Sequence, residues 1–216
     1  MNAPPQRPIN ARRARSPVCG CDARASRTGA RRDQVLDAAV ACARSAGFHA
    51  ASMAQIAKAA GLSVGQIYRY FENKNAIIAA LVAREAASTR QALSRIDRSQ
   101  GPLLDAIATH LPAEIDRCLD RARTALRLEI LAEAARNTGV AQTVREVEAR
   151  ETALSEQLMA RLRRPEWNDQ EFRARVEVIG LMFDGLQTLA VRRPQADRGA
   201  LARSLESMIR LLFSPS

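Results

Sequence analysis

Residues 61–74 read GLSVGQIYRYFENK, and this stretch decides the fold. A glycine turn leads to Ser63, a residue type that caps helix N-termini, and apolar residues then recur at spacings of three and four. The pattern predicts a short helix over 63–71. Asn73 is placed to cap a second, longer helix that starts at Lys74.

The segment before this stretch predicts another short helix. Ser52 stands where an N-cap belongs, ahead of MAQIAKAAG, whose apolar residues form one helical face. Two short helices at about 52–59 and 63–71, joined by a glycine-containing turn at 60–62, describe a helix-turn-helix. In such a unit the second helix lies in the major groove of duplex DNA.

The remainder of the sequence predicts an all-α chain of about nine helices. A helix starts at Arg31 and is stopped by Gly47, whereas residues 1–27, rich in Pro, Arg, Ser and Ala, are expected to form a disordered basic tail. Pro112 is expected to kink or break its helix because proline lacks a backbone N–H. The helices expected after residue 73 run from 74 to about 96, over 103–119, over 123–137, from 140 to the break at 163–165, over 169–191 and over 197–213.

The charge of the chain is unevenly distributed. Residues 1–74 contain 12 Lys or Arg and 4 Asp or Glu, against 21 and 19 in the other 142 residues, so +8 of the net +10 lies in the first third. A basic end on a nearly neutral body suggests a polyanionic partner, and DNA, RNA and acidic lipid all remain open on charge alone. No apolar run approaches the roughly 18 residues of a membrane-spanning helix. We therefore expect no membrane partner and a cytoplasmic location.

Residue types that carry catalysis or bind metals form no recognised pattern. Cys19, Cys21, Cys42 and Cys118 lack the spacing of a zinc site, so we expect reduced thiols, no metal and no cofactor. The two histidines belong to no Ser/His/Asp or Cys/His arrangement, and no phosphate-binding loop is present. The sequence therefore predicts a protein that is not an enzyme.

The helix predicted over 63–71 has a face suited to reading bases. Gln66 and Arg69, together with Val64 if its face is turned outward, are placed to reach base edges. Ser63 lets the helix start approach a phosphate, since free backbone N–H groups and the helix dipole favour an anion there. A solvated Arg69 remains the alternative for that side chain.

Neighbouring residues are suited to the DNA backbone. Tyr68 and Tyr70 have hydroxyls that can donate hydrogen bonds to phosphate oxygens, and Lys74 adds a cation at the start of the next helix. The alternative for Tyr68 is a core position with only its hydroxyl in water.

Residues 31–78 resemble the DNA-binding domain of the TetR family of transcriptional repressors. The shared marks are the "AA...AR..G" close of the first helix, "S...IAKAAG", "GLSVGQIYRYF" and the F-x-N-K link to the fourth helix. The resemblance covers about a quarter of the chain, and the basic N-terminal arm is longer than is typical of the family. The domains expected are a tail at 1–27, a DNA-binding domain at 28–73, and a ligand-binding and dimerisation domain at 74–216.

The resemblance also implies roles for single residues. Positions that match the family's phosphate contacts are Ser52, Tyr68, Tyr70 and Lys74. Those that match its base contacts are Ser63, Val64, Gly65, Gln66 and Arg69.

The last two helices carry apolar stripes that predict a dimer interface. In 169–191 one stripe steps by four and three, and a second stripe, with Val178, Met182, Gly185 and Leu189, lies on another face. A helix that is apolar on two faces needs two partners. We expect a four-helix bundle across a twofold axis, which the resemblance favours; burial of both stripes inside one subunit stays open. The predicted interface residues are Phe172, Val176, Ile179, Phe183, Leu186, Leu201, Leu205, Met208 and Leu212.

The helices between the DNA-binding head and this seam carry isolated polar groups. The resemblance implies a small-molecule effector in a mostly apolar cavity there. The candidate ligand contacts are His110, Glu133, Arg136, Glu151, Met182 and Asp184. For the polar residues among these, a solvated or salt-bridged surface position remains the alternative.

These observations predict a ligand-responsive repressor that binds double-stranded operator DNA as a homodimer and is released by an unknown effector. An architectural protein that binds DNA without sequence preference is the main alternative, and an enzyme with a helical body is the other.

Overall fold

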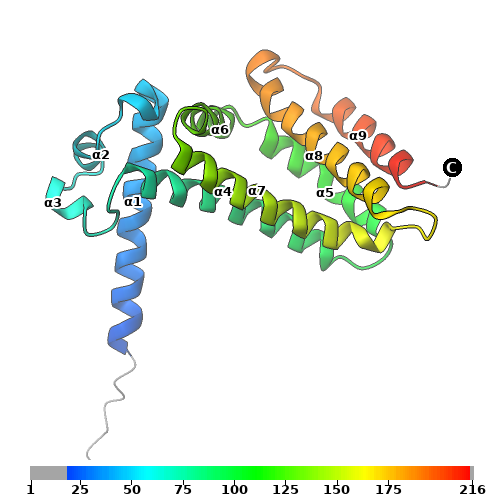
Figure 1. Ribbon diagram of the computed structural model, residues 1–216, viewed down its shortest axis with the longest axis horizontal. Helices are drawn as coiled ribbons and strands as arrows, with labels where there is room; N and C mark the ends of the chain where they lie inside the picture. Colours follow the sequence, from blue (N-terminus) through cyan, green and yellow to red (C-terminus); the bar gives the residue numbers. More distant parts are fainter. Residues whose placement is uncertain (1–18, 215–216) are drawn as a thin grey trace, which may run out of the picture.

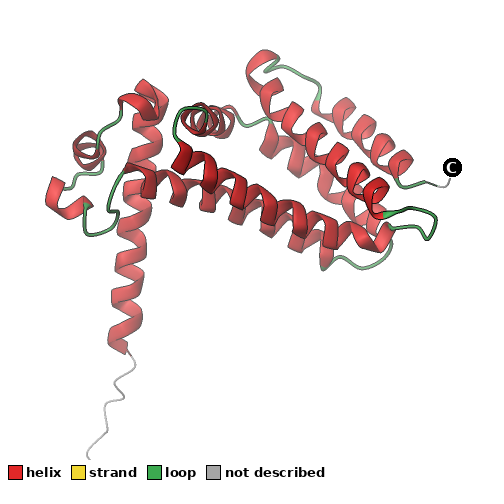
Figure 2. Ribbon diagram, in the orientation of Figure 1, coloured by secondary structure: helices red, strands yellow, loops and turns green. Residues whose placement is uncertain are grey.

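The structure of the protein is a computed structural model that describes the backbone of residues 19–214 and the side chains of residues 26–214. Every regular element in this part of the chain is a helix (Figure 2). The all-α fold predicted from the sequence is confirmed. In chain order the helices are α1 (Cys19–Ala50), α2 (Met53–Ala59), α3 (Val64–Ile67), α4 (Lys74–Asp97), α5 (Leu103–Cys118), α6 (Arg121–Ala134), α7 (Thr138–Met159), a short 3-10 helix (Ala160–Leu162), α8 (Asp169–Arg192) and α9 (Arg198–Leu212).

Helix α1 is longer than expected. It begins at Cys19, so the expectation of a disordered tail is wrong for residues 19–27, and residues 1–18 lie outside the described part. Ala and Arg, which are frequent here, favour helix, and no proline interrupts the segment. Gly47 interrupts the helix with φ 77°, in the region where glycine is favoured, and one further turn runs to Ala50. The N-terminal half of α1 projects away from the rest of the molecule (Figure 1).

The helix-turn-helix is present, but its second helix is shorter than predicted. The α-helical part of α3 ends at Ile67 instead of residue 71. The chain then tightens, because the N–H groups of Arg69 and Tyr70 bond to carbonyl oxygens three residues back, at 3.2 and 3.0 Å. The segment up to Phe71 therefore keeps a helical course with a smaller radius.

Pro112 does not break α5, which continues to Cys118. The residues on either side of the proline explain this, since Leu111 and Ile115 are both buried in one cluster with residues of α8 and α9. The tertiary contacts of each half hold the helix together where one backbone hydrogen bond is missing. Helix α6 begins two residues before the expected start, because Asp120 accepts the N–H of Arg123 and caps it.

One apolar core joins the N-terminal head, which we define as α1 to α3, to the body, which we define as α4 to α9. It contains buried residues of α1 to α4 and also Leu126 and Ile130 of α6 and Val140 and Val144 of α7. Helix α6 thus packs directly on the head. Because the core is closely packed, a displacement of α6 shifts the helices of the head as well.

The body is a bundle in which α4 and α7 run side by side away from the head, with α5, α8 and α9 at the far end (Figure 1). Two further apolar clusters hold this end together. One surrounds Trp167 and Phe213, whose rings meet edge to face at 5.7 Å, and the other joins α5 to α8 and α9. Within the described residues no helix is long and apolar enough to cross a membrane.

Candidate DNA-binding surface, cavity and dimer face

Both short helices of the head begin with a reciprocal cap. Ser52 Oγ accepts the N–H of Gln55 at 3.2 Å, and Gln55 Oε1 accepts the N–H of Ser52 at 2.8 Å. Ser63 and Gln66 repeat the arrangement at 3.2 and 2.8 Å. The two serine caps are confirmed, but the partner glutamines were missed, although S-x-x-Q is a capping-box pattern readable from sequence.

The outward side of α3 and of the segment that follows it carries residues predicted to contact DNA, and we call Val64, Gln66, Tyr68 and Arg69 the exposed row. Val64 is 47% exposed and Tyr68 51% exposed, while Ile67 is fully buried against α1 and α2. Gln66 and Arg69 are also exposed, and Tyr70 is half-buried. The Oε1 atom of Gln66 is used in the cap, so its amide N–H groups are the part that remains for a base.

Gly65 lies in the first turn of α3 without a packing reason. A Cβ added there would meet no atom within 4 Å. Glycine inside a helix costs roughly 0.5–1 kcal/mol relative to alanine. Since nothing in the described part of the chain requires it, its use fits the close approach of another molecule to the backbone.

Arg32 of α1 fastens the end of the reading segment and was not predicted. Its guanidinium donates to the carbonyl oxygen of Tyr70 at 2.7 Å and stacks over the ring of Phe71 at 4.3 Å. These contacts fix the segment against α1 and bring a cation beside it.

Lys74 has an internal partner. Its Nζ donates to the carbonyl oxygen of Phe48 at 2.7 Å and lies 3.5 Å from that of His49. Phe48 is also bound through its N–H group, which donates to Glu129 Oε2 of α6 at 3.3 Å. The lysine predicted as a phosphate contact thus ties the last turn of α1 to the start of α4.

A cavity of about 380 Å³ lies inside the body, between α4, α5, α7 and α8. Its volume falls in the range of about 300–1,000 Å³ that is usual for small-molecule sites. Three predicted ligand contacts, His110, Glu151 and Asp184, line it. A smaller cavity of about 80 Å³ continues toward α6.

The other three predicted ligand contacts do not line either cavity. Glu133 is buried at the end of α6 and pairs with Arg136 at 2.7 Å, while Met182 packs in the cluster that joins α5 to α8 and α9. Burial opposes ionisation of Glu133, but hydrogen bonds from Arg136 and Asn137 prevail and lower its pKa. These assignments were wrong because helical spacing does not tell which buried neighbours a polar residue has.

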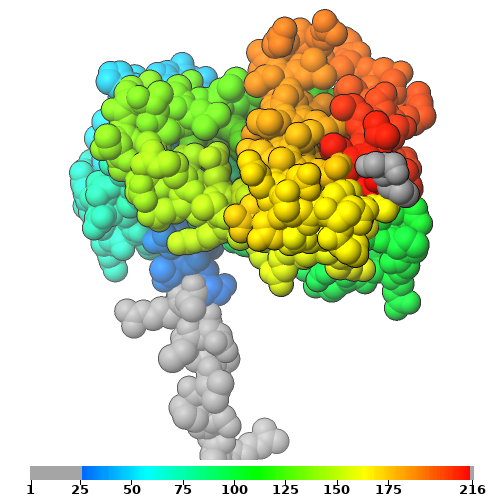
Figure 3. Space-filling model, turned by 45° about the vertical axis from the view of Figure 1, so that its right-hand side comes forward, coloured from blue at the N-terminus to red at the C-terminus, as the bar shows by residue number. Residues whose placement is uncertain are grey.

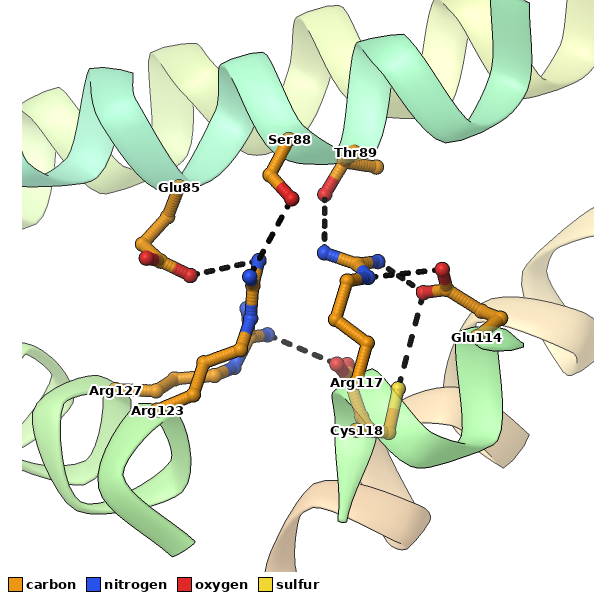
Figure 4. Close-up of polar contacts among 9 residues, drawn as sticks. Glu85, Ser88, Thr89, Glu114, Arg117, Cys118, Arg123 and Arg127 are labelled. Carbon is orange, nitrogen blue, oxygen red and sulfur yellow. Dashed lines mark hydrogen bonds and ion pairs between the residues drawn. The ribbon is translucent and has the colours of Figure 1, made fainter. Parts of the chain in front are cut away.

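A network of charged residues, missed in the sequence, lies where α4, α5 and α6 meet beside the cavity (Figure 4). Arg117 of α5 pairs with Glu114 and lies 3.5 Å from the hydroxyl of Thr89 on α4. Arg123 of α6 pairs with Glu85 of α4 at 2.7 Å. The network therefore links α4, α5 and α6 at the head-proximal end of the cavity.

Cys118 belongs to the same network. Its Sγ donates to Glu114 at 3.8 Å, and burial, with the neighbouring carboxylate, raises its pKa to about 12. The thiol is therefore protonated at neutral pH, as expected for a structural cysteine. Among the described residues no group of His, Cys, Asp and Glu is arranged to hold a metal ion.

The predicted dimer stripe is mostly internal. Phe172, Val176, Leu186 and Leu205 are buried in the subunit's own clusters, which corrects their assignment to an interface. Ile179, Phe183, Leu201 and Leu212 are half-buried against the same clusters. Periodicity identified both stripes of α8, but it does not tell which one faces inward.

A different row of apolar side chains is exposed on the last two helices. We call it the α8–α9 face: Val178 and Leu181 of α8, 39% and 61% exposed, and Met208 and Leu211 of α9, 50% and 75% exposed. Of these, only Met208 was in the predicted interface. Figure 3 shows α8 and α9, orange to red, together on the surface of the body. Large apolar side chains exposed on helices that share one surface are typical of a protein–protein interaction site.

Known proteins resemble the chain at two levels. Residues 35–81 match the family model of bacterial regulatory proteins, tetR family. The HTH-type transcriptional regulator BetI of Serratia proteamaculans is 36% identical over 83 residues, which are 38% of this chain and 38% of BetI. The sequence match thus spans well under half of that relative's length.

Solved structures resemble nearly the whole chain. GusR of Salmonella enterica superimposes with a TM-score of 0.68 and 25% identity, over 85% of this chain and 95% of GusR. FadR of Bacillus subtilis, solved in complex with stearoyl-CoA, gives 0.68 and 20%, over 84% and 97%. The head is thus similar in sequence, and the body is similar mainly in fold.

Proposed function

We propose that this protein, a member of the tetR family of bacterial regulatory proteins, is a cytoplasmic transcriptional repressor. It binds operator DNA as a homodimer and is released from it by a small-molecule effector. The observation that carries the proposal is the exposed row on α3, on a capped helix held against α1 and inside the segment that matches the family model.

The exposed row supports an arrangement in which some residues contact base edges and others contact phosphates. Gln66 and Arg69 read base edges, with Val64 supplying an apolar contact, and Gly65 lets the helix backbone approach closely. The hydroxyls of Ser52, Ser63, Tyr68 and Tyr70 serve the phosphates, and the N-termini of α2 and α3 favour anions. Lys74 acts from behind by positioning the junction of α1 and α4.

A dimer through the α8–α9 face gives the two heads a fixed separation. Twofold symmetry places the same apolar row on both subunits, so the row of each subunit is covered by the other subunit. Two reading segments about 34–36 Å apart then meet successive major grooves on one side of the duplex.

Effector release follows from the links of α6. The cavity and its charged network contact α6 through Arg127 and Arg123, and two residues beyond Arg127, Glu129 holds the N–H of Phe48. Because Lys74 holds the carbonyl of Phe48, a shift of α6 changes how α1 meets α4, and with it the separation of the two heads. By linkage, effector and operator then weaken each other's binding by the same factor.

A DNA-binding titration tests the proposal. The full-length protein is titrated, at one salt concentration, against a fragment of its own promoter and a random duplex of equal length. We expect the promoter to bind at least about 10³-fold more tightly. Equal affinity for both would contradict a repressor and favour the architectural alternative.

A further inference from the structure

The cavity in the body has a polar end and an apolar end. Helices α4 and α7 run in the same direction away from the head (Figure 1). Along α7 the lining changes from polar to apolar, and on α4 Thr89 is followed by Ala92, Leu93 and Ile96, with the exposed Arg95 among them. On α7 the order is Glu148, Glu151, Thr152 and Ser155, followed by Leu158 and Met159. A molecule that fills this space therefore needs a polar group near the head-proximal end and an apolar body beyond it.

The arginines at the polar end already have partners. Arg117 pairs with Glu114, and Arg127 pairs with Asp184 at 2.8 Å. Arg95, the remaining arginine of the lining, lies on α4 and is exposed. An anionic group entering the cavity would have to compete with a carboxylate for each paired arginine.

Two carboxylates of α7 remain without an ion pair in the described part of the chain. Glu151 Oε1 is buried and has no hydrogen-bond partner there. Glu148 lies one turn earlier on the same face and is largely exposed. Partial desolvation raises the pKa of its carboxyl group, Arg127 lowers this pKa, and the carboxylates of Asp184 and Glu151 raise it. A buried carboxylate oxygen without a hydrogen-bond partner lowers stability, and a ligand that supplies a positively charged hydrogen-bond donor removes this cost.

The small number of aromatic rings in the lining argues against one class of cationic ligand, the quaternary ammonium compounds. Cages for quaternary ammonium groups are built from several Trp, Tyr or Phe rings, but among the described residues the lining contains a single ring of these types, that of Phe183. Carboxylates without partners instead favour ligands with charged N–H groups, which can donate hydrogen bonds to them.

We propose that the cavity selects amphipathic organic cations that carry N–H bonds, that is, protonated amines with an apolar body. The ammonium group is bound by Glu151 and Glu148, and the apolar body lies among Ile96, Ile107 and Leu158. The proposal rests on the proposed function in treating this cavity as the effector site. It adds the chemical class of the effector.

A matched series of ligands tests the class. Octylamine, octyltrimethylammonium and octanoate share one chain and differ only in the head group, and octylamine is protonated at neutral pH. Each is titrated into the full-length protein, without DNA, by isothermal calorimetry. We expect octylamine to bind at least about tenfold more tightly than either of the others. Octanoate binding as tightly as octylamine overturns the choice of charge, and equal binding of the quaternary ammonium overturns the requirement for N–H.

Variants on α7 test the residue. Glu151→Gln keeps the size of the side chain and removes its charge, so octylamine affinity should fall at least about tenfold. Glu146→Gln is the matched control, because Glu146 is exposed on the same helix, bonds to Gln142 and does not line the cavity. Its octylamine affinity should match that of the wild type. Octylamine affinity that is unchanged in Glu151→Gln overturns the assignment.

A stability readout and a DNA readout separate the possible failures. Because only Oε1 of Glu151 is buried without a partner, Glu151→Gln should leave the melting temperature of the unliganded protein unchanged or raise it slightly, and a clear fall would contradict the environment inferred for this carboxylate. Operator binding is measured on the same preparations. Wild-type protein that binds its operator but shows no preference for octylamine disproves the ligand class alone, whereas failure to bind the operator disproves the proposed function.

Discussion

Replacing Leu181 and Leu211 by glutamate is expected to separate the proposed dimer into folded monomers. The two side chains are 61% and 75% exposed in the single chain and belong to the α8–α9 face. Neither contributes to the buried clusters, so the subunit's own core should tolerate the change.

The size of the effect follows from the exposed area. Full burial of a leucine side chain contributes about 1.5–3 kcal/mol, so burying the exposed part of each contributes about 1–2 kcal/mol. Twofold symmetry brings four such side chains together, for about 4–8 kcal/mol in total. Losing even the lower value raises the dimer dissociation constant about 10³-fold, and four buried carboxylates add to the penalty.

Sedimentation velocity over a range of concentrations measures the change. The wild type should sediment as a dimer and the double variant as a monomer with unchanged circular dichroism. Leu154→Glu is the control for an introduced charge, since Leu154 is a partly exposed leucine of α7 outside the α8–α9 face; it does not line the cavity, whereas Leu181 does. A double variant that dimerises like the wild type would refute the reasoning about this face.

Three further changes test the head and the charged network. Tyr68→Phe should weaken binding to every duplex by the same factor, about fivefold. Gln66→Ala should instead lose about 1–3 kcal/mol of discrimination at one base position. An equal loss of discrimination from both variants in a competition assay would contradict the assignment of Tyr68 to phosphates and Gln66 to bases. Lys74→Met should lower the free energy of unfolding in urea by about 1–2 kcal/mol, because it leaves the carbonyl of Phe48 without its donor, and an unchanged midpoint would argue against this link. Cys118, with a pKa raised to about 12 by burial, should react with a thiol reagent at pH 8 only after unfolding, and rapid labelling of the native protein at this site would contradict its environment.

The parts of the fold that could be predicted from the sequence are those with local causes. Ser52, Ser63 and Asn73 cap their helices in the structure as predicted, because an N-cap depends on residues within one turn. The exposed row on α3 was predicted for the same reason. The buried side of the same segment was predicted from Ile67 and Phe71, two apolar residues four positions apart.

What the sequence did not reveal depends on contacts between distant segments. Phe172 and Leu181 both belong to apolar stripes of α8, and only the packed subunit shows that the first is buried and the second exposed. Glu133 and Glu151 are both acidic residues on otherwise apolar helices, yet one has an arginine partner and the other lines the cavity. Lys74 shows the same limit, since its partner lies 26 residues earlier in the chain.

Selection of bound sequences from a random pool of duplexes, with the wild-type protein, tests the central claim most directly. The claim is that the segment from Ser63 to Phe71 enters the major groove in pairs. It predicts one enriched motif with twofold symmetry, and the same selection with Gln66→Ala should relax symmetry-related positions in both half-sites. A pool that shows no enriched motif, or an asymmetric motif that Gln66→Ala leaves intact, would contradict the claim.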